Sequence, residues 1–318
     1  MTTNPAIAVV IPSYRVRGQI MDVLDGMPPE VARIFVVDDA CPDGSGDHVE
    51  EHCSDRRVSV LRNLENLGVG GAVLAGYHAA LEWGAEIIVK VDGDGQMDPA
   101  LLPYFIDPIL RGEADYTKGN RFFDLGNIRS MPPVRIFGNA VLSFMAKLSS
   151  GYWDVFDPTN GFTAIHADVV RRLPFNRISQ RYFFESDMLF RLGTLRAVVV
   201  DVPMDARYDG ETSNLHVSRV LGPFLRGHLR NFGKRIFYNY FLRDLSIASL
   251  ELVAGLGLMI GGLAWGAGQW SAGNRIGEPA SAGTVMLAAL PVILGLQFLL
   301  GFLSYDIASV PRRSIHRR

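Results

Sequence analysis

The sequence predicts an α/β domain built on a mostly parallel sheet with flanking helices, followed by amphipathic interface helices and a two-helix transmembrane hairpin. Two observations carry this prediction. Short apolar runs alternate with helical segments through the first two thirds of the chain, and two long, nearly uncharged segments lie near its end. Strands separated by helices form parallel sheets, whereas about 20 consecutive apolar residues are enough to cross a bilayer.

Four apolar runs are expected to be buried strands, and polar residues follow most of them. The runs cover residues 6–11, 33–37, 58–61 and 86–91, and a helix is expected over residues 70–83. Apolar runs without polar alternation are typical of strands that are covered on both faces. In such sheets, ligands bind beyond the carboxyl ends of the strands. The polar residues that follow the strands should therefore converge on one edge.

Composition excludes several classes of protein. Only Cys41 and Cys53 are present, which excludes a disulfide scaffold, and the net charge of −2 argues against nucleic-acid binding. The charge is unevenly distributed. From residue 215 onward there are 11 basic and 4 acidic residues, whereas the preceding 214 residues carry 20 basic and 29 acidic ones. This asymmetry predicts an acidic soluble domain docked on an anionic membrane surface.

Two segments are long and apolar enough to span a membrane. Residues 245–268 contain Glu251 as their only ionisable group, and residues 284–305 contain no charge. Buried core helices are the alternative, but these usually keep a polar stripe. We therefore expect a cytosolic domain over residues 1–214, juxtamembrane amphipathic helices over 215–243, and a hairpin with a basic tail over 244–318. The loop of the hairpin is expected at residues 269–283.

The flanks of these segments predict their orientation. Basic residues precede the first span and follow the second, whereas the loop between them contains only Arg275 and Glu278. Positive charge stays on the cytoplasmic side. The sequence thus predicts a multi-pass protein of the inner (cell) membrane with both termini and the α/β domain in the cytoplasm. Residues 217–242 mix arginines with aromatic residues, as in helices that lie among lipid headgroups. A plain linker or a helix that caps the domain is the alternative.

An acidic motif follows the strand at residues 86–91. Asp92 and Asp94 are separated by one glycine, and Gln96 follows two residues later. Two carboxylates this close can share one Mg²⁺ or Mn²⁺ ion, and substrate phosphates then fill the open coordination positions. An ordinary acidic turn is the alternative reading. The position of the motif at the end of a buried strand, near Asp38 and Asp39, favours the metal site.

Several motifs resemble a known family. VVIPSY at 9–14, VVDDACPDGS at 36–45 and VDGDGQMDP at 91–99 resemble family 2 glycosyltransferases with the GT-A fold. KGNRF at 118–122, DPTNGFTAI at 157–165 and ARYDGETSN at 206–214 resemble the polyprenyl-phosphate glycosyltransferases of the dolichyl-phosphate mannose synthase type. The resemblance covers the chain to about residue 215.

This resemblance implies three groups of site residues. The nucleotide pocket would be lined by Pro12, Tyr14, Asp38, Asp39 and Asp92. The metal, Mg²⁺ or Mn²⁺, would be held by Asp92, Asp94 and Gln96. The acceptor phosphate would contact Arg121, Arg135, Arg207 and Ser213. Catalysis would depend on Asp94 and the three arginines.

The chemistry of a phosphate acceptor agrees with this residue set. A phosphate monoester has a second pKa near 6 and is already a dianionic nucleophile at neutral pH. It needs arginines that position it, whereas a hydroxyl acceptor needs a general base. Glu185 or Asp187 is the candidate for such a base, although both also suit the acidic start of a helix.

The sequence therefore predicts an inverting, metal-dependent transfer of a hexose from a nucleotide sugar to a membrane polyprenyl phosphate such as undecaprenyl phosphate. UDP-glucose is the favoured donor, ahead of GDP-mannose, UDP-galactose and UDP-N-acetylglucosamine. A membrane-anchored transferase acting on a hydroxyl of a glycan or lipid is the alternative, and a non-catalytic sugar-nucleotide binder is a third reading. Membrane lipid is an expected partner, nucleic acid is not, and glycine-rich spans are compatible with a homo-oligomer.

Overall fold

The computed structural model describes residues 5–123, 133–205 and 217–317, without the side chains of residues 133–135 and 217–221. The chain divides into two units. The first contains residues 1–233 together with 311–318, and the second contains residues 234–310.

The first unit is built on a seven-stranded mixed sheet. Its strand order is β3-β2-β1-β4-β6-β5-β7, and only β6 runs antiparallel to its neighbours β4 and β5. The strands are β1 (Ile7–Ser13), β2 (Arg33–Asp38), β3 (Val58–Arg62), β4 (Ile87–Lys90), β5 (Tyr116–Asn120), β6 (Thr163–His166) and β7 (Val199–Pro203). The four strands expected from the apolar runs are confirmed as β1 to β4, and they are mutually parallel.

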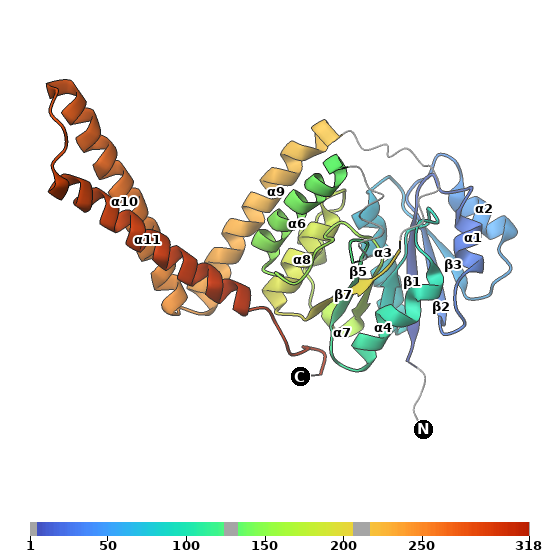
Figure 1. Cartoon of the computed structure of the whole chain (residues 1–318). Coiled ribbons are helices and arrows are strands. Elements are labelled where there is room, and N and C mark those ends of the chain that lie inside the picture. The colour runs from blue at the N-terminus through green and yellow to red at the C-terminus, as the bar shows by residue number, and fades with distance from the viewer. Residues whose placement is uncertain (1–4, 124–132, 206–216, 318) are drawn as a thin grey trace. The chain divides into compact units, whose positions relative to one another are not determined.

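Helices cover both faces of this sheet (Figure 1). They are α1 (Ile20–Asp25), α2 (Ser45–His52), α3 (Val69–Trp83), α4 (Leu102–Leu110), α6 (Pro133–Ser150), α7 (Ala167–Val170), α8 (Phe184–Leu195) and α9 (Val217–Phe237), with 3₁₀ turns at Pro99–Leu101 and Phe175–Arg177. The helix predicted over residues 70–83 is confirmed as α3. An α/β sheet with helices on both faces agrees with the predicted fold class.

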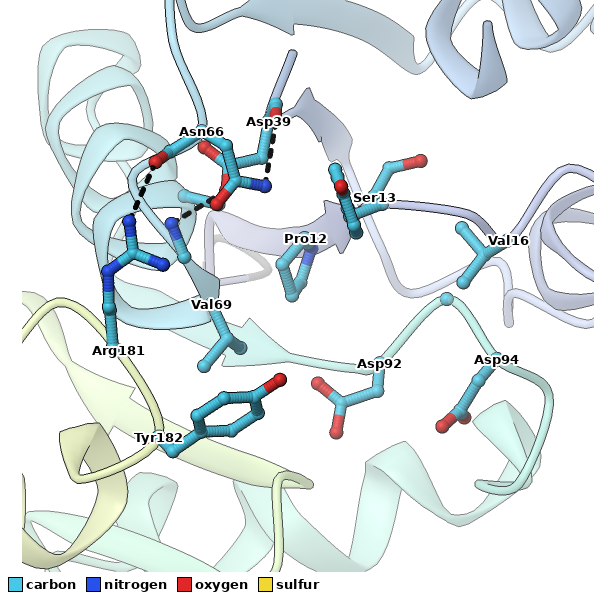
Figure 2. Close-up of a pocket in the computed structure, with 14 residues that line it drawn as sticks. Pro12, Ser13, Val16, Asp39, Asn66, Val69, Asp92, Asp94, Arg181 and Tyr182 are labelled. Atoms are coloured by element: carbon cyan, nitrogen blue, oxygen red, sulfur yellow. Dashed lines mark hydrogen bonds between the residues drawn. The ribbon is translucent and has the colours of Figure 1, made fainter. Parts of the chain in front are cut away.

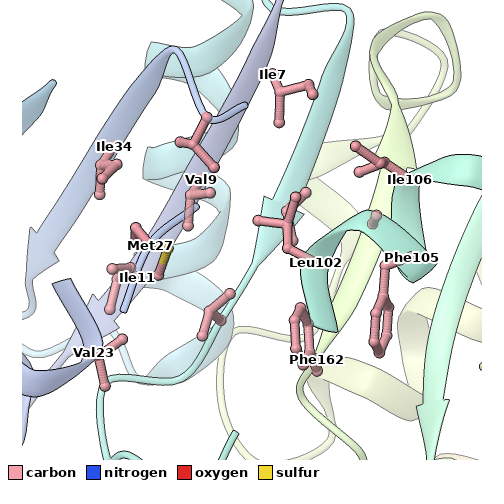
Figure 3. Close-up of a cluster of buried hydrophobic side chains, with 14 of the residues drawn as sticks. Ile7, Val9, Ile11, Val23, Met27, Ile34, Leu102, Phe105, Ile106 and Phe162 are labelled. Atoms are coloured by element: carbon pink, nitrogen blue, oxygen red, sulfur yellow. The ribbon is translucent and has the colours of Figure 1, made fainter. Parts of the chain in front are cut away.

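Alternation along β1 explains the two helical layers. Its residues Ile7, Val9 and Ile11 face α1 and α4, where they form one cluster with Leu102 and Phe105 (Figure 3). Val10 points to the other face, because a Cβ placed on Gly76 of α3 would lie 2.2 Å from it. Successive side chains of a strand point to opposite faces, so an uninterrupted apolar run needs a cover on each side.

Helix α9 packs on α6 and α8 within the first unit (Figure 1). Two buried polar contacts hold it: His228 Nδ1 lies 2.8 Å from Ser149 Oγ, and Asn231 donates a 2.8 Å hydrogen bond to Asp187. Its other face exposes Leu225, Leu229 and basic residues. The helix therefore covers the domain with one side and exposes apolar and basic residues on the other.

The C-terminal residues also belong to the first unit. Asp115, which precedes β5, accepts hydrogen bonds from the backbone N–H groups of Ile315 and His316 and lies 2.7 Å from His316 Nδ1. Ser314 donates to the carbonyl of Gly112. The end of the chain is thus fixed on the domain by an aspartate with no exposed surface.

The second unit contains two long apolar helices, α10 (Ile247–Ile276) and α11 (Ala282–Ala308), preceded by a short π-helix (Tyr238–Arg243). Both helices are long and apolar enough to cross a membrane. They pack closely, since a Cβ on Gly295 would lie 2.8 Å from the carbonyl oxygen of Gly255. The expected loop at 269–283 is wrong in extent: α10 continues to Ile276, and Gly277, at φ +70°, ends it.

Candidate active site

A cavity of about 250 Å³ lies beyond the carboxyl ends of β1, β2 and β4, and we call it the rim cavity (Figure 2). Its lining comes from these strand ends, from the start of α3 and from the segment before α8. The lining residues are Pro12, Ser13, Tyr14, Val16, Asp39, Asn66, Gly68, Val69, Ala72, Asp92, Gly93, Asp94, Arg181 and Tyr182. Polar residues at three parallel strand ends converge here because those ends share one edge of the sheet.

Asp92 and Asp94 form the acidic wall of the rim cavity (Figure 2). Asp94 Oδ1 accepts a 3.1 Å hydrogen bond from the backbone of Gln96, whose side chain is not part of the described lining. No group of three His, Cys, Asp or Glu side chains among the described residues forms a complete metal site. Two carboxylates nevertheless fit a Mg²⁺ or Mn²⁺ ion, which commonly takes its other ligands from water and substrate phosphates.

Gly161 leaves room for the Asp92 carboxylate. A Cβ at this position would lie 2.0 Å from Asp92 Oδ2 and 2.6 Å from Lys90 Nζ. The loop before β6 therefore approaches the acidic wall with its bare backbone, which only glycine allows. Gly161 lies within the DPTNGFTAI motif, whose resemblance to the family gives this glycine no function of its own.

Lys90, the last residue of β4, is a buried cation beside this wall. Its Nζ lies 2.7 Å from Asp92 Oδ1, 3.1 Å from the carbonyl oxygen of Gly161 and 3.4 Å from Glu185 Oε1. Burial alone would favour the neutral amine, but the charges of Asp92 and Glu185 outweigh it and raise the pKa of Lys90 above its ordinary value. Burial raises the pKa of Glu185, and Lys90 opposes this shift.

Asp38 and Asp39 have different surroundings. Asp39 lines the rim cavity, and its carboxylate accepts hydrogen bonds from Asn63 Nδ2 (2.7 Å) and from the backbone of Leu67 (3.0 Å) and Gly68 (2.7 Å). A carboxylate offers about four acceptor sites, so one remains on Oδ2. Asp38 is outside the described lining and accepts from the backbone N–H groups of Cys41 and Gly46.

Arg181 and Tyr182 were not expected in the site. Both precede α8, and the Tyr182 ring lies beside Val69 and Asp92 (Figure 2). Arg181 donates to the carbonyl of Asn66 at 3.4 Å. Nothing in their local sequence places them next to strand ends that lie about 90 to 170 residues earlier, although an exposed arginine–aromatic pair before an acidic helix start is a weak signal.

The same two residues also line a second cavity of about 760 Å³, which we call the arginine groove. It runs between the segment before α8 and helix α9. Its lining residues are Ser179, Arg181, Tyr182, Phe183, Gly222, Pro223, Phe224, Arg226, Gly227 and Arg230. Phe183 and Phe224 stack edge to face at 5.4 Å between ring centroids. The groove thus combines three arginines with an aromatic wall and adjoins the rim cavity.

Of the arginines expected to contact the acceptor phosphate, the structure describes the side chain of Arg121. Arg121 forms a two-pronged ion pair with the buried Asp157, with Nε–Oδ2 at 2.7 Å and Nη2–Oδ1 at 2.9 Å. This pair and Lys118 hold the pKa of Asp157 below its ordinary value despite its burial. Arg135 lies in the first turn of α6, and its side chain is outside the described part of the structure. Arg207 and Ser213 also lie outside the described residues.

The two candidate bases also differ. Asp187 is fully buried and accepts hydrogen bonds from the Ser179 backbone (3.0 Å) and from Asn231 (2.8 Å), so it joins α8 to α9. Glu185 has a side chain 14% exposed and is paired with Lys90. Only Glu185 therefore lies next to the acidic wall.

Comparison with known proteins identifies the class. The model for glycosyl transferase family 2 matches residues 8–173, and the chain belongs to this family. The undecaprenyl-phosphate mannosyltransferase of Micrococcus luteus is 31% identical over 62% of this chain and 82% of its own length. The polyprenol monophosphomannose synthase of Mycolicibacterium smegmatis is 29% identical over 62% of this chain and 75% of its own length.

A solved structure shows the same fold. Glucosyl-3-phosphoglycerate synthase from Mycobacterium tuberculosis, in a complex with Mn²⁺, UDP and phosphoglyceric acid, superposes with a TM-score of 0.55. The alignment covers 73% of this chain and 78% of that chain at 18% identity. The family match and this likeness establish a glycosyltransferase with the GT-A fold.

Proposed function

We propose that this glycosyltransferase transfers a hexose from a nucleotide sugar to the phosphate of a membrane polyprenyl phosphate, with inversion at the anomeric carbon. The observation that carries the proposal is the junction of the rim cavity and the arginine groove at Arg181 and Tyr182. Relatives named for undecaprenyl-phosphate and polyprenol-phosphate mannosyl transfer support the same acceptor class.

The nucleotide sugar would occupy the rim cavity. Pro12, Tyr14 and Asp39 line it, and the free acceptor site on Asp39 Oδ2 suits an N–H of the base. Asp38 would act indirectly, by fixing the loop after β2. Asp92 and Asp94, with Gln96 adjacent, would hold a divalent cation against the diphosphate. Such an ion, when bound, neutralises the charge that develops on the leaving diphosphate.

The acceptor would approach through the arginine groove. Arg226, Arg230 and Arg181 offer charge to a dianionic phosphate, and the aromatic wall offers an apolar surface to the isoprenoid chain. Arg121, Arg135, Arg207 and Ser213 remain proposed acceptor contacts from the sequence motifs. An oxygen of the acceptor phosphate bonds to the anomeric carbon as the bond from that carbon to the nucleoside diphosphate breaks, and the diphosphate leaves with the electron pair.

We propose that α10 and α11 cross the inner (cell) membrane, with both termini and the catalytic domain in the cytoplasm. The two helices are long and apolar enough to cross, and the basic flanks support the orientation. Exposed Leu225 and Leu229 on α9 suit contact with lipid.

The test is transfer of radiolabelled sugar from a panel of nucleotide sugars to undecaprenyl phosphate by the full chain in detergent, with Mn²⁺ or Mg²⁺. UDP-glucose is the donor we favour, and GDP-mannose, UDP-galactose and UDP-N-acetylglucosamine complete the panel. The proposal predicts a metal-dependent product that partitions into organic solvent. Hydrolysis of a nucleotide sugar without a lipid product from any donor would contradict it and direct attention to a hydroxyl acceptor.

A further inference from the structure

The ammonium group of Lys90 lies inside the domain among three oxygen atoms. It donates hydrogen bonds to the carbonyl oxygen of Gly161 and to Glu185 Oε1, and it forms an ion pair with Asp92 Oδ1, a buried oxygen that accepts no hydrogen bond of its own. The lysine side chain is only 1% exposed. The three oxygen atoms come from the turn after β4, from α8 and from the loop before β6. One lysine thus joins three separate segments at the acidic wall.

A buried lysine is costly unless charge and hydrogen bonds compensate for its desolvation. Here two carboxylates compensate for the desolvation of one ammonium group, so Lys90, Asp92 and Glu185 together carry one net negative charge. Removal of the lysine would leave two carboxylates near each other without a cation between them. The favourable interaction therefore depends on all three groups and fixes where the Asp92 carboxylate points.

We infer that Lys90 is a positioning residue for the donor site. Its ammonium group holds Asp92 through Oδ1, so that this carboxylate is preorganised for a divalent cation. Glu185 is the counter-ion of Lys90 and not a general base. For Lys90 the inference rests on the proposed function only in taking the rim cavity as the site of a cation and a nucleotide; for Glu185 it also rests on the phosphate acceptor. Partners that orient a metal-binding carboxylate typically change metal affinity about 10–100-fold when removed.

Two observations favour this role over a purely structural ion pair. Asp92 lines the rim cavity while contacting Lys90, so the two functions share one side chain. A Cβ at residue 161 would collide with Asp92 Oδ2 and Lys90 Nζ, so the backbone of the loop before β6 confines the Asp92 carboxylate from its other side. A phosphate acceptor needs no base, which leaves Glu185 without a proton to accept.

The first experiment measures UDP binding to the full chain by calorimetry, with and without Mn²⁺. Lys90→Met should lose about 10–100-fold of the Mn²⁺-dependent affinity and keep the metal-independent affinity. Lys147→Met is the matched control, since Lys147 Nζ contacts the carbonyl of Trp153 outside both cavities. A Lys90→Met protein that retains its Mn²⁺-dependent affinity within twofold would overturn the inference.

Two further variants separate positioning from folding. Gly161→Ala keeps every charge but pushes on Asp92, and it should reproduce the loss of Mn²⁺-dependent affinity even if Lys90→Met fails to fold. The double variant Lys90→Met/Glu185→Gln removes the repulsion between carboxylates. It should recover thermal stability relative to Lys90→Met without recovering Mn²⁺-dependent UDP affinity, whereas a merely structural lysine would recover both.

Glu185→Gln alone tests the counter-ion role. It retains a hydrogen-bond acceptor for Lys90, so kcat should stay within about fivefold and the pH–rate profile should keep its shape. Loss of kcat by about 100-fold or more, the range of general-base catalysis, would show that Glu185 is a base. Because UDP and Mn²⁺ binding need no acceptor, a failure to form lipid product would contradict the proposed function without affecting the role inferred for Lys90. The role of Glu185 would then be decided by the kcat of Glu185→Gln with a hydroxyl acceptor.

Discussion

The rim cavity and the arginine groove share Arg181 and Tyr182 but are lined by opposite charges. The rim cavity presents Asp39, Asp92 and Asp94, whereas the groove presents Arg226 and Arg230 beside aromatic rings. The difference indicates two ways to bind a phosphate. An acidic wall attracts phosphate only with a cation between them, whereas arginines bind it directly and leave it exposed as a nucleophile.

Two buried lysines, Lys90 on β4 and Lys118 on β5, lie on either side of β6 and differ in their surroundings. Lys90 lies between two carboxylates, and its pKa is raised. Lys118 donates instead to the backbone carbonyls of Asp157 and Asn160, and burial lowers its pKa to about 8. Charge, more than burial alone, therefore decides which lysine is firmly cationic. This places the fixed positive charge at the acidic wall.

The largest expected effect concerns the acidic wall. Asp94→Asn should reduce transfer by about 1,000-fold, because a metal-assisted step depends on several kcal/mol of charge stabilisation. The measurement is radiolabel transfer to polyprenyl phosphate across a Mn²⁺ titration.

Asp107→Asn is the matched control for this variant, because Asp107 pairs with Arg111 on the exposed side of α4. Retention of more than a tenth of the activity by Asp94→Asn would show that the rim cavity does not depend on this carboxylate, and the contrast between the two cavities would fail.

The next effect concerns the groove. Replacement of both Arg226 and Arg230 by alanine should raise KM for polyprenyl phosphate about tenfold or more, since a hydrogen bond to a charged group contributes about 1.5–3 kcal/mol. KM for the nucleotide sugar should not change. Arg171→Ala provides the control, because Arg171 pairs with Asp168 on α7 away from both cavities. A change confined to the nucleotide sugar would assign the groove to the donor.

The sequence was sufficient to predict the edge of the sheet but not every side chain on it. Pro12, Asp39, Asp92 and Asp94 converge because β1, β2 and β4 are parallel and end together. Neighbouring residues at a strand end point in opposite directions. The VVDDACPDGS motif therefore did not predict which aspartate would line the cavity, Asp39, and which would bind the next loop, Asp38.

The residues that reach the rim cavity only through tertiary packing could not be predicted from the local sequence. Arg181 and Tyr182 reach the site because α8 packs near the start of α3, a contact between segments about a hundred residues apart. Lys90 left a clearer signal. A lysine inside an otherwise apolar strand must find a buried partner, and the nearest acidic motif begins two residues later.

The smallest expected effect concerns the helix that carries the groove. His228 lies on the inner face of α9, among Ser149 and the rings of Phe183 and Phe224, and burial lowers its pKa to about 4. As the pH falls, His228 in the unfolded chain binds a proton near pH 6.5, whereas in the folded protein it binds one only at a lower pH. The stability from neutral His228 is therefore complete above about pH 6.5 and is lost as the pH falls toward 4.

Between pH 6.5 and 5.5 this loss should reach about 1 kcal/mol, since one proton contributes at most about 1.4 kcal/mol per pH unit. His228→Gln keeps a partner for Ser149 but does not titrate, so its unfolding midpoint should fall less with acid than that of the parent protein. Equal slopes for the two proteins would mean that protonation of His228 does not loosen α9, and that the arginine groove persists in acid.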